Sequence, residues 1–214
     1  MNYEKIIFKT ALKTILALIL SISILFFATG LIFPGLIGDF TYKLGLTSIS
    51  VPYTKAQYEY TKDINDLATL IDRAYQIDDY QTVVDFVDKM YEHEHYLDYV
   101  DYEMAQNDIN YAQYLSGIYV LSLLEIGDSD TATDIVIANT KVSIENGEIK
   151  YTNVIKYLVV GIDKYQPSVE KRSDMNEFIN LHRINVIATG DVSLITDYEL
   201  DYQVIFNKLR GDSE

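Results

Sequence analysis

The stretch RAYQIDDYQTVVDFVDKM, residues 73–90, decides the fold of this chain. Apolar residues at three-to-four spacing lead up to it, stop at IDDY (residues 77–80), and resume from Val83 to Met90. This pattern indicates two amphipathic helices joined by a tight turn. We expect Asp78 to take the left-handed conformation that ends the first helix, and Asp79 to cap the second.

The same kind of turn recurs at IGDS (residues 126–129) and TGDV (residues 189–192). Helical hairpins stack because no single hairpin can bury its own apolar face. The sequence therefore predicts an all-α fold, beginning at Ser50-x-Pro52, with the apolar stripe from Ala56 to Tyr75 on one helix. Later helices are expected near residues 90–103, 109–126 (capped by Asp108), 131–146, 153–165, 174–188 (capped by Asp174) and up to 208.

The segment near residues 142–151 allows two structures. Its sequence alternates around Asn146-Gly147, which is the signal of a short β-hairpin. The same glycine is also typical of the residue that follows a helix end. The spacing of Ala132, Ile135, Ala138 and Val142 favours the helix.

Residues 73–90 and 123–139 resemble the helical hairpin of tetratricopeptide repeats. Residues 73–90 offer an aromatic residue before the turn (Tyr75), an Asp turn, and Val83 and Val87 near the family's positions in the second helix. Residues 123–139 match at the Gly-Asp turn and the small residue Ala132, and depart from the family at its aromatic positions. The turns lie 49 and 63 residues apart, whereas that family repeats every 34 residues or so. The resemblance implies an α-solenoid-like stack of hairpins and a groove for a protein or peptide. It implies no chemistry.

A membrane segment precedes this domain. Residues 14–38, TILALILSISILFFATGLIFPGLIG, carry no charge over 25 positions, a helix of about 37 Å that is long enough to cross a bilayer. Three lysines (Lys5, Lys9 and Lys13) precede the segment, so the positive-inside rule places the amino terminus in the cytoplasm. We expect an uncleaved signal anchor. The alternatives are peptidase cleavage after residues 28–30 and a buried core helix.

The predicted organisation is an anchor over residues 1–38, a juxtamembrane linker over 39–51, and an extracytoplasmic helical domain over 52–210. Beyond residue 38 the chain holds 14 basic and 31 acidic side chains, a net charge of −17. Such a surface repels phosphate backbones, so nucleic acid is excluded as a partner. The chain has no cysteine, which excludes disulfides, thiol nucleophiles and zinc–cysteine sites.

The three histidines give no metal or catalytic site by sequence reasoning. On a helix, His93 and His95 would point to opposite faces, since successive residues turn by about 100°. His182 lies in the middle of a predicted helix and is expected to be a partly buried structural residue. No phosphate-binding loop or nucleophile motif occurs, so no cofactor and no catalytic residue are predicted.

The sequence predicts a membrane-anchored, non-enzymatic interaction or scaffold module outside the cytoplasmic membrane of a bacterial-type cell. Its partner would be a protein or an envelope polymer. The alternatives are an accessory subunit of a membrane transport or secretion complex, and a metal-assisted enzyme that uses His95 and nearby acids. Tyrosine is enriched at interfaces, and the candidate partner-binding residues are Tyr58, Arg73, Tyr75, Tyr111 and Tyr114.

Overall fold

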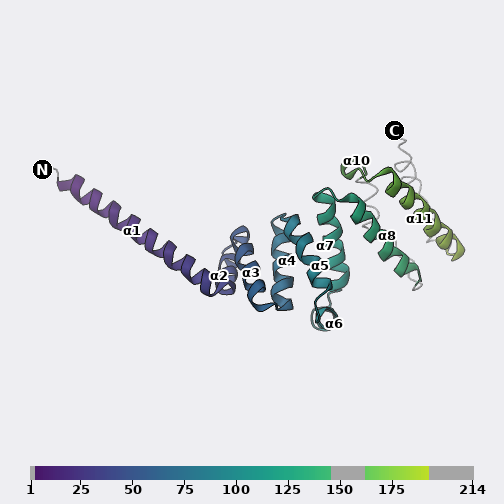
Figure 1. Cartoon of the computed structure of the whole chain (residues 1–214), viewed down its shortest axis with the longest axis horizontal. Coiled ribbons are helices and arrows are strands. Elements are labelled where there is room, and N and C mark those ends of the chain that lie inside the picture. The colour runs from purple at the N-terminus through teal and green to yellow at the C-terminus, as the bar shows by residue number, and fades with distance from the viewer. Residues whose placement is uncertain (1–2, 146–161, 193–214) are drawn as a thin grey trace. The chain divides into compact units, whose positions relative to one another are not determined.

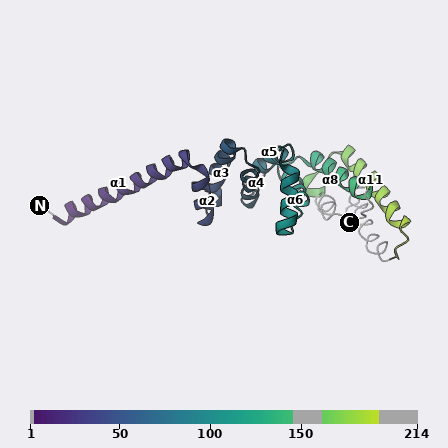
Figure 2. The same ribbon diagram turned by 90° about the horizontal axis from the view of Figure 1, so that it is seen from below.

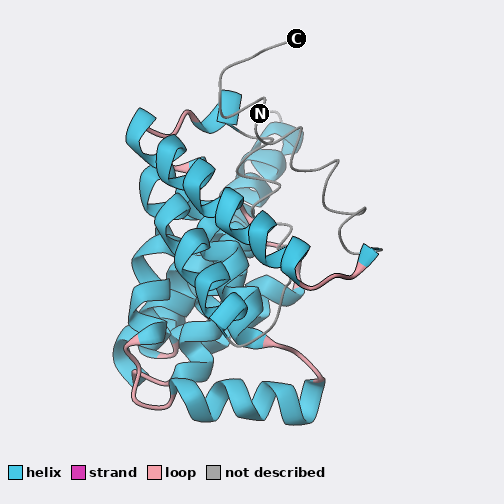
Figure 3. Ribbon diagram, turned by 90° about the vertical axis from the view of Figure 1, so that its right-hand side faces the viewer, coloured by secondary structure: helices cyan, strands magenta, loops and turns pink. Residues whose placement is uncertain are grey.

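The structure is a computed structural model that describes residues 3–145 and 162–192, and all of its regular elements there are helices (Figures 1 and 3). The helices are α1 (Tyr3–Ile32), α2 (Pro34–Lys43), α3 (Thr47–Thr61), α4 (Ile64–Gln76), α5 (Tyr80–Tyr91), α6 (Tyr96–Asn107), α7 (Tyr111–Glu125), α8 (Ser129–Glu145), α10 (Ile162–Tyr165) and α11 (Val169–Ala188). The predicted all-α class is confirmed. Residues 142–145 are helical, while residues 146–151 lie outside the described part.

The chain divides into two compact units. The first comprises residues 1–82 and 88–99, and the second comprises residues 83–87 and 100–214. Within the first unit, α2 packs on α3 and α3 on α4, while α1 meets α2. Within the second, α8 packs against both α7 and α11.

Helix α1 contains a segment, Phe8–Ile32, that is long and apolar enough to cross a membrane. Its apolar side chains are largely exposed. The hydroxyls of Thr14, Ser23 and Thr29 donate to the carbonyl four residues earlier on the same helix. This internal bonding satisfies polar groups that have no water to bind in a bilayer.

The helix that could span a membrane ends before the last residue of the predicted segment. Helix α1 stops at Ile32, and Pro34 is the first residue of a new helix, a position where its missing N–H costs nothing. Ile37 and Gly38 are buried in the first unit. The predicted linker is largely helical as well, because α2 runs to Lys43 and α3 begins at Thr47.

The predicted turn at residues 77–80 is confirmed. Asp78 has a φ of 59°, and Asp79 accepts a hydrogen bond from the Thr82 amide through its side chain. The amides of Asp79 and Asp78 donate to the carbonyls of Ala74 (3.0 Å) and Tyr75 (3.2 Å). These paired bonds satisfy two carbonyls at the end of α4, the arrangement of a Schellman motif.

The turn at residues 126–129 repeats this geometry. Gly127 has a φ of 90°, the Asp128 amide donates to the Leu123 carbonyl at 2.8 Å, and the Asp128 side chain accepts from the Thr131 amide. At TGDV, Gly190 also has a positive φ, of 68°. The second helix predicted there, up to residue 208, lies outside the described residues.

The prediction of one helix through residues 56–75 is wrong. The chain breaks at Lys62, which has a φ of 55°, and Asp63 caps α4 by accepting from the Asn65 amide. Because of this break, Ala56 and Tyr60 at the start of the predicted stripe are exposed. The stripe does form the core on α4, where Leu67, Leu70, Ile71 and Ala74 are completely buried.

Two helices start at a residue other than the predicted one, because another side chain caps each of them. Asp108 adopts a positive φ of 54°, so Asn110 caps α7 in its place by accepting from the Gln113 amide. Helix α11 starts at Val169 and not at Asp174, because the Ser168 hydroxyl accepts from the Lys171 amide. The cap of α7 thus lies two residues after the predicted one, and the cap of α11 lies six residues before it.

Two glycines of α7 and its turn give a matched test of this backbone geometry. We predict that Gly127→Ala lowers the stability of the second unit by about 1–2 kcal/mol, because alanine is strained at positive φ. Gly117→Ala in the interior of α7 should raise it by about 0.5–1 kcal/mol. A Cβ at either position meets no atom within 4 Å, so packing does not confuse the comparison. Hydrogen exchange of the α7 and α8 amides measures both, and equal effects would contradict the assigned turn.

Candidate functional site

A groove of about 640 Å³ lies in the first unit, where the end of α1 meets α2, α3 and α4. Apolar and polar side chains both line it. The residues that line it are Ile32, Phe33, Pro34, Gly35, Leu36, Asp39, Thr54, Gln57, Tyr60, Asn65, Asp66, Thr69 and Arg73. Concave sites with an apolar wall and a few convergent polar groups are the usual form of binding sites.

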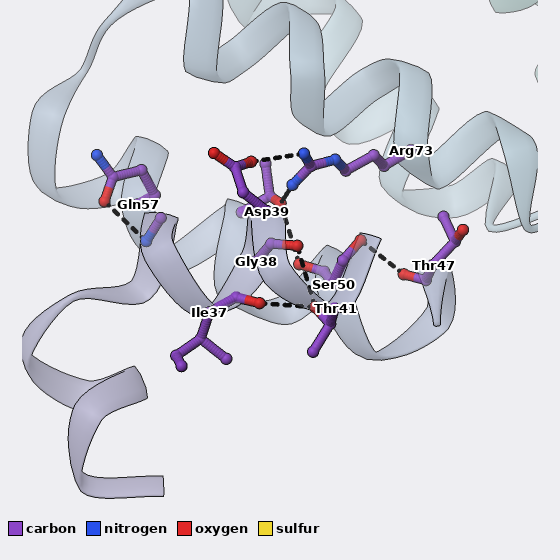
Figure 4. Close-up of polar contacts among 10 residues, drawn as sticks. Ile37, Gly38, Asp39, Thr41, Thr47, Ser50, Gln57 and Arg73 are labelled. Atoms are coloured by element: carbon purple, nitrogen blue, oxygen red, sulfur yellow. Dashed lines mark hydrogen bonds and ion pairs between the residues drawn. The ribbon is translucent and has the colours of Figure 1, made fainter. Parts of the chain in front are cut away.

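Arg73 joins the three helices beneath the groove. Only 8% of its side chain is exposed. One terminal nitrogen, Nη1, donates to Thr54 Oγ1 on α3, and the other, Nη2, donates to Asp39 Oδ1 on α2, each at 2.7 Å. The guanidinium also lies over the ring of Tyr42 on α2, 4.5 Å from its centroid. Figure 4 shows Arg73 reaching across to Asp39.

A second polar chain fixes the beginning of α2. Phe33 precedes this helix and supplies no side-chain cap. Instead, the Gly35 amide donates to Gln57 Oε1 on α3 at 3.1 Å (Figure 4). Gln57 Nε2 in turn donates to Asp66 Oδ2 on α4 (3.3 Å), which also accepts from the Thr61 hydroxyl (2.6 Å). A cap borrowed from a neighbouring helix satisfies one of the free amides of α2.

Two glycines let α2 approach α3 closely enough for these bonds. A Cβ on Gly35 would lie 2.9 Å from the Gln57 side chain. A Cβ on Gly38 would lie 3.2 Å from Thr54 Oγ1 and 3.4 Å from Arg73 Nη1. The absence of side chains at these positions therefore makes room for the side chains of Gln57, Thr54 and Arg73.

The lining residues of the groove present hydroxyls, amides, carboxylates and one buried cation. They include no histidine, cysteine, serine or lysine that could act as a nucleophile or base. The Thr54 hydroxyl is occupied, because it donates to the Ser50 carbonyl and accepts from Arg73. Arg73 Nε is buried and has no hydrogen-bond partner within the described residues. Asp39 pairs with this cation, and a second carboxylate, Asp66, also lines the groove. The site can therefore hold a polar group next to an apolar one, with donors and acceptors both at hand.

Arg73 is the one predicted partner-binding residue that lines the groove. Tyr58 is buried, and the half-buried Tyr75 packs its ring against Tyr80, with centroids 6.2 Å apart. In the second unit Tyr111 is buried, whereas Tyr114 is 40% exposed. Partner binding by these five residues stays a prediction.

Sequence reasoning missed the other polar residues of the groove. Asp39 was assigned to a linker, and it lies 34 positions before Arg73. No spacing rule relates residues so far apart. Gln57 and Thr54 belong to no motif in the sequence. The glycines at 35 and 38 were a usable signal, because two glycines three residues apart on one helix mark a close approach.

The helical interpretation of His93 and His95 is wrong. Both lie in the turn between α5 and α6, because α5 ends at Tyr91 and α6 begins at Tyr96. His93 Nδ1 accepts from the His95 amide (3.1 Å), so Nε2 carries the proton and donates to the Lys62 carbonyl (3.0 Å). One nitrogen of His93 thus bonds within the turn, and the other joins the turn to the end of α3.

His95 is exposed and lies 3.7 Å from both Glu94 and Asp98. Across the described residues, no group of three or more histidine, cysteine, aspartate or glutamate side chains is placed to hold a metal ion. Comparison of the chain with protein families, curated proteins and solved structures finds no match.

We predict that Arg73→Met weakens the docking of α2 by about 1–3 kcal/mol, the range for hydrogen bonds to a charged group. Lys89→Met is the matched control, because it also removes one positive charge. Lys89 lies 3.9 Å from Glu59 on the surface, and both side chains are 46% exposed, so its loss should cost at most about 1 kcal/mol. Hydrogen exchange of the α2 amides measures both. Equal protection in the two variants would contradict the role given to Arg73.

His182 should make the second unit sensitive to acid. Its side chain is 1% exposed, and burial lowers the pKa of this imidazole below its usual 6.5. Below that pH the unfolded chain binds the proton and the folded chain does not, so stability is complete above about pH 6.5 and falls as the pH decreases.

We predict that His182→Leu removes this part of the pH dependence, which amounts to at most about 1.4 kcal/mol per pH unit. Hydrogen exchange of α11 between about pH 8 and pH 5 measures the slope. Phe178→Leu, in the same helix, is the control: it perturbs the core but keeps the histidine, and it should retain the wild-type slope. A His182→Leu slope equal to that of the wild type would refute the assignment.

Proposed function

We propose that this chain is a membrane-anchored, non-enzymatic interaction module, with its amino terminus in the cytoplasm and its helical domain outside. The observation that carries the proposal is the direct continuation of a membrane-length helix into a packed helical unit with a groove at the junction. Helix α1 exposes almost all of its apolar side chains. Burying such a surface in lipid is favourable, whereas leaving it in water is not.

The distribution of charge supports this orientation. Three lysines (Lys5, Lys9 and Lys13) precede the uncharged stretch that begins at residue 14, and the chain beyond residue 38 carries a net charge of −17. Positive residues are retained on the cytoplasmic side of a membrane. The acidic domain would then attract a basic protein surface or a cationic envelope polymer.

The groove supports binding in preference to catalysis. Its one buried cation, Arg73, is held by Asp39, Thr54 and Tyr42, so it is already positioned before a partner arrives. Groups that are held in place before binding lose little entropy when a partner docks. The resemblance of residues 73–90 and 123–139 to tetratricopeptide repeats, whose grooves bind proteins and peptides, is consistent with this proposal and stays a prediction.

A second candidate is an accessory subunit of a membrane transport or secretion complex, in which α1 itself contacts other membrane helices. The exposure of α1 favours it, because the faces of this helix are available to protein as well as lipid. The two candidates differ in whether the identity of the membrane helix matters.

Site-specific photo-cross-linking in intact cells tests the proposal. We place the cross-linking amino acid at Tyr60, which lines the groove and is 86% exposed, and at Leu97, which is 73% exposed and lies on α6. The expected result is a discrete adduct from position 60 that position 97 does not give. Arg73→Met should reduce this adduct, because it loosens α2 and deforms the groove.

The same experiment is repeated with α1 replaced by an unrelated membrane helix. Survival of the adduct supports the interaction module, in which α1 only anchors the domain. Loss of the adduct at an unchanged expression level supports the accessory subunit. If positions 60 and 97 give the same products, the groove is not the binding surface.

A further inference from the structure

Helix α2 carries an exposed apolar stripe on its outer face. The side chains recur at spacings of three and four residues, which places them on one side of a helix. The stripe consists of Phe33, immediately before α2, then Leu36 and Phe40, and Leu44 immediately after it; they are 59%, 63%, 51% and 59% exposed, respectively. Four large apolar side chains in one row are more than the isolated exposed residues normal for a protein surface.

The stripe cannot turn inward, because the opposite face of α2 is already packed. Ile37, Gly38 and Thr41 are buried there. Gly38 lies against Thr54, and the Gly35 amide is bonded to Gln57. The first unit therefore covers one face of α2 and leaves the apolar stripe on the other face exposed.

The position of α2 relative to α1 is also determined within this unit. The ring of Tyr53 on α3 packs edge-on against Phe26 of α1, with centroids 6.3 Å apart. Gly30 of α1 lies so close to the Tyr53 ring that a Cβ would overlap it. Only Phe33 separates the two helices, and Figure 2 shows α2 running across the direction of α1. The stripe therefore begins at the level where α1 ends.

We infer that the stripe on α2 lies in the interfacial layer of the membrane that α1 enters. The inference rests on the proposed membrane anchoring. Lipid is the expected contact of the stripe because the stripe continues the apolar surface of α1. Leu31 and Ile32 at the end of α1 are 72% and 68% exposed, and no polar residue separates them from Phe33. A helix that crosses the bilayer places the next turn of chain in the headgroup region.

The charges on α2 fit this orientation. Asp39 and Lys43 are exposed and lie along one edge of the stripe, where they would contact headgroups and water while Phe40 and Leu44 face the acyl boundary. Because Phe33 and Leu36 also line the groove, the groove opens at the lipid surface. The domain is then held against the membrane by two contacts, α1 and α2, rather than suspended from one.

Single-cysteine labelling tests the inference cleanly, since the natural chain contains no cysteine. We make Phe40→Cys and Leu44→Cys in the full-length protein, with Leu20→Cys in α1 as the membrane reference and Leu97→Cys as the aqueous reference. All four side chains are at least half exposed, so the labels do not disturb a core. Each variant carries an environment-sensitive fluorophore and is reconstituted in phosphatidylcholine vesicles, which avoid repulsion of the acidic domain.

The expected result is that labels at positions 40 and 44 are quenched by lipid-bound quenchers of shallow depth and are several-fold less accessible to aqueous iodide than the label at 97. The inference is overturned if the labels at 40 and 44 are as accessible to iodide as the label at 97. The anchoring by α1 would still hold in that case, provided that deep lipid quenchers reach the label at 20. Shielding from both quenchers would also overturn it, since a second copy of the chain would then cover the stripe. If the label at 20 escapes lipid quenching, the membrane anchoring itself fails.

Discussion

The buried guanidinium of Arg73 is the constraint on which the first unit depends. Taking a charge out of water is expensive unless it is paired and hydrogen-bonded. Here only one partner of the ion pair is buried: Arg73 is 8% exposed and the Asp39 side chain is 63% exposed. The desolvation cost therefore falls on one charge, and Asp39, Thr54 and Tyr42 all offset it. These partners lie on α2 and α3, so satisfying one side chain of α4 orders three helices.

Helix α2 is the element most dependent on that arrangement. It has ten residues and no side-chain cap of its own, and isolated helices of that length are not stable in water. Its position follows from Arg73, from the Gly35–Gln57 bond, and from the close approach that Gly38 permits. Helix α2 lines one side of the groove and carries the apolar stripe. Each is therefore a property of how the helix is docked and not of its local sequence.

The turns of the fold could be predicted from sequence because their chemistry is local. Asp78 and Gly127 are residue types that accept positive φ, and an aspartate follows each of them as a cap. The break at Lys62 could not be predicted in this way, since lysine is not a residue that marks a left-handed turn. There the cap at Asp63 was the only local signal. The turn that holds His93 was missed because its bonds join it to α3, 31 residues earlier.

Of the site, sequence identified Arg73 and none of its partners. Its carboxylate partner, Asp39, was expected in a linker that follows the membrane segment, whereas the structure places it on α2. A helix in place of a linker would change how an anchor positions the domain. A domain on a flexible linker samples a volume set by the linker length, and its effective concentration at a membrane partner falls as the linker grows. Here α2 replaces the linker and is bonded to the domain it leads into. The groove is consequently held close to the end of α1. Under the proposed membrane anchoring, its partner would present a binding surface close to the membrane.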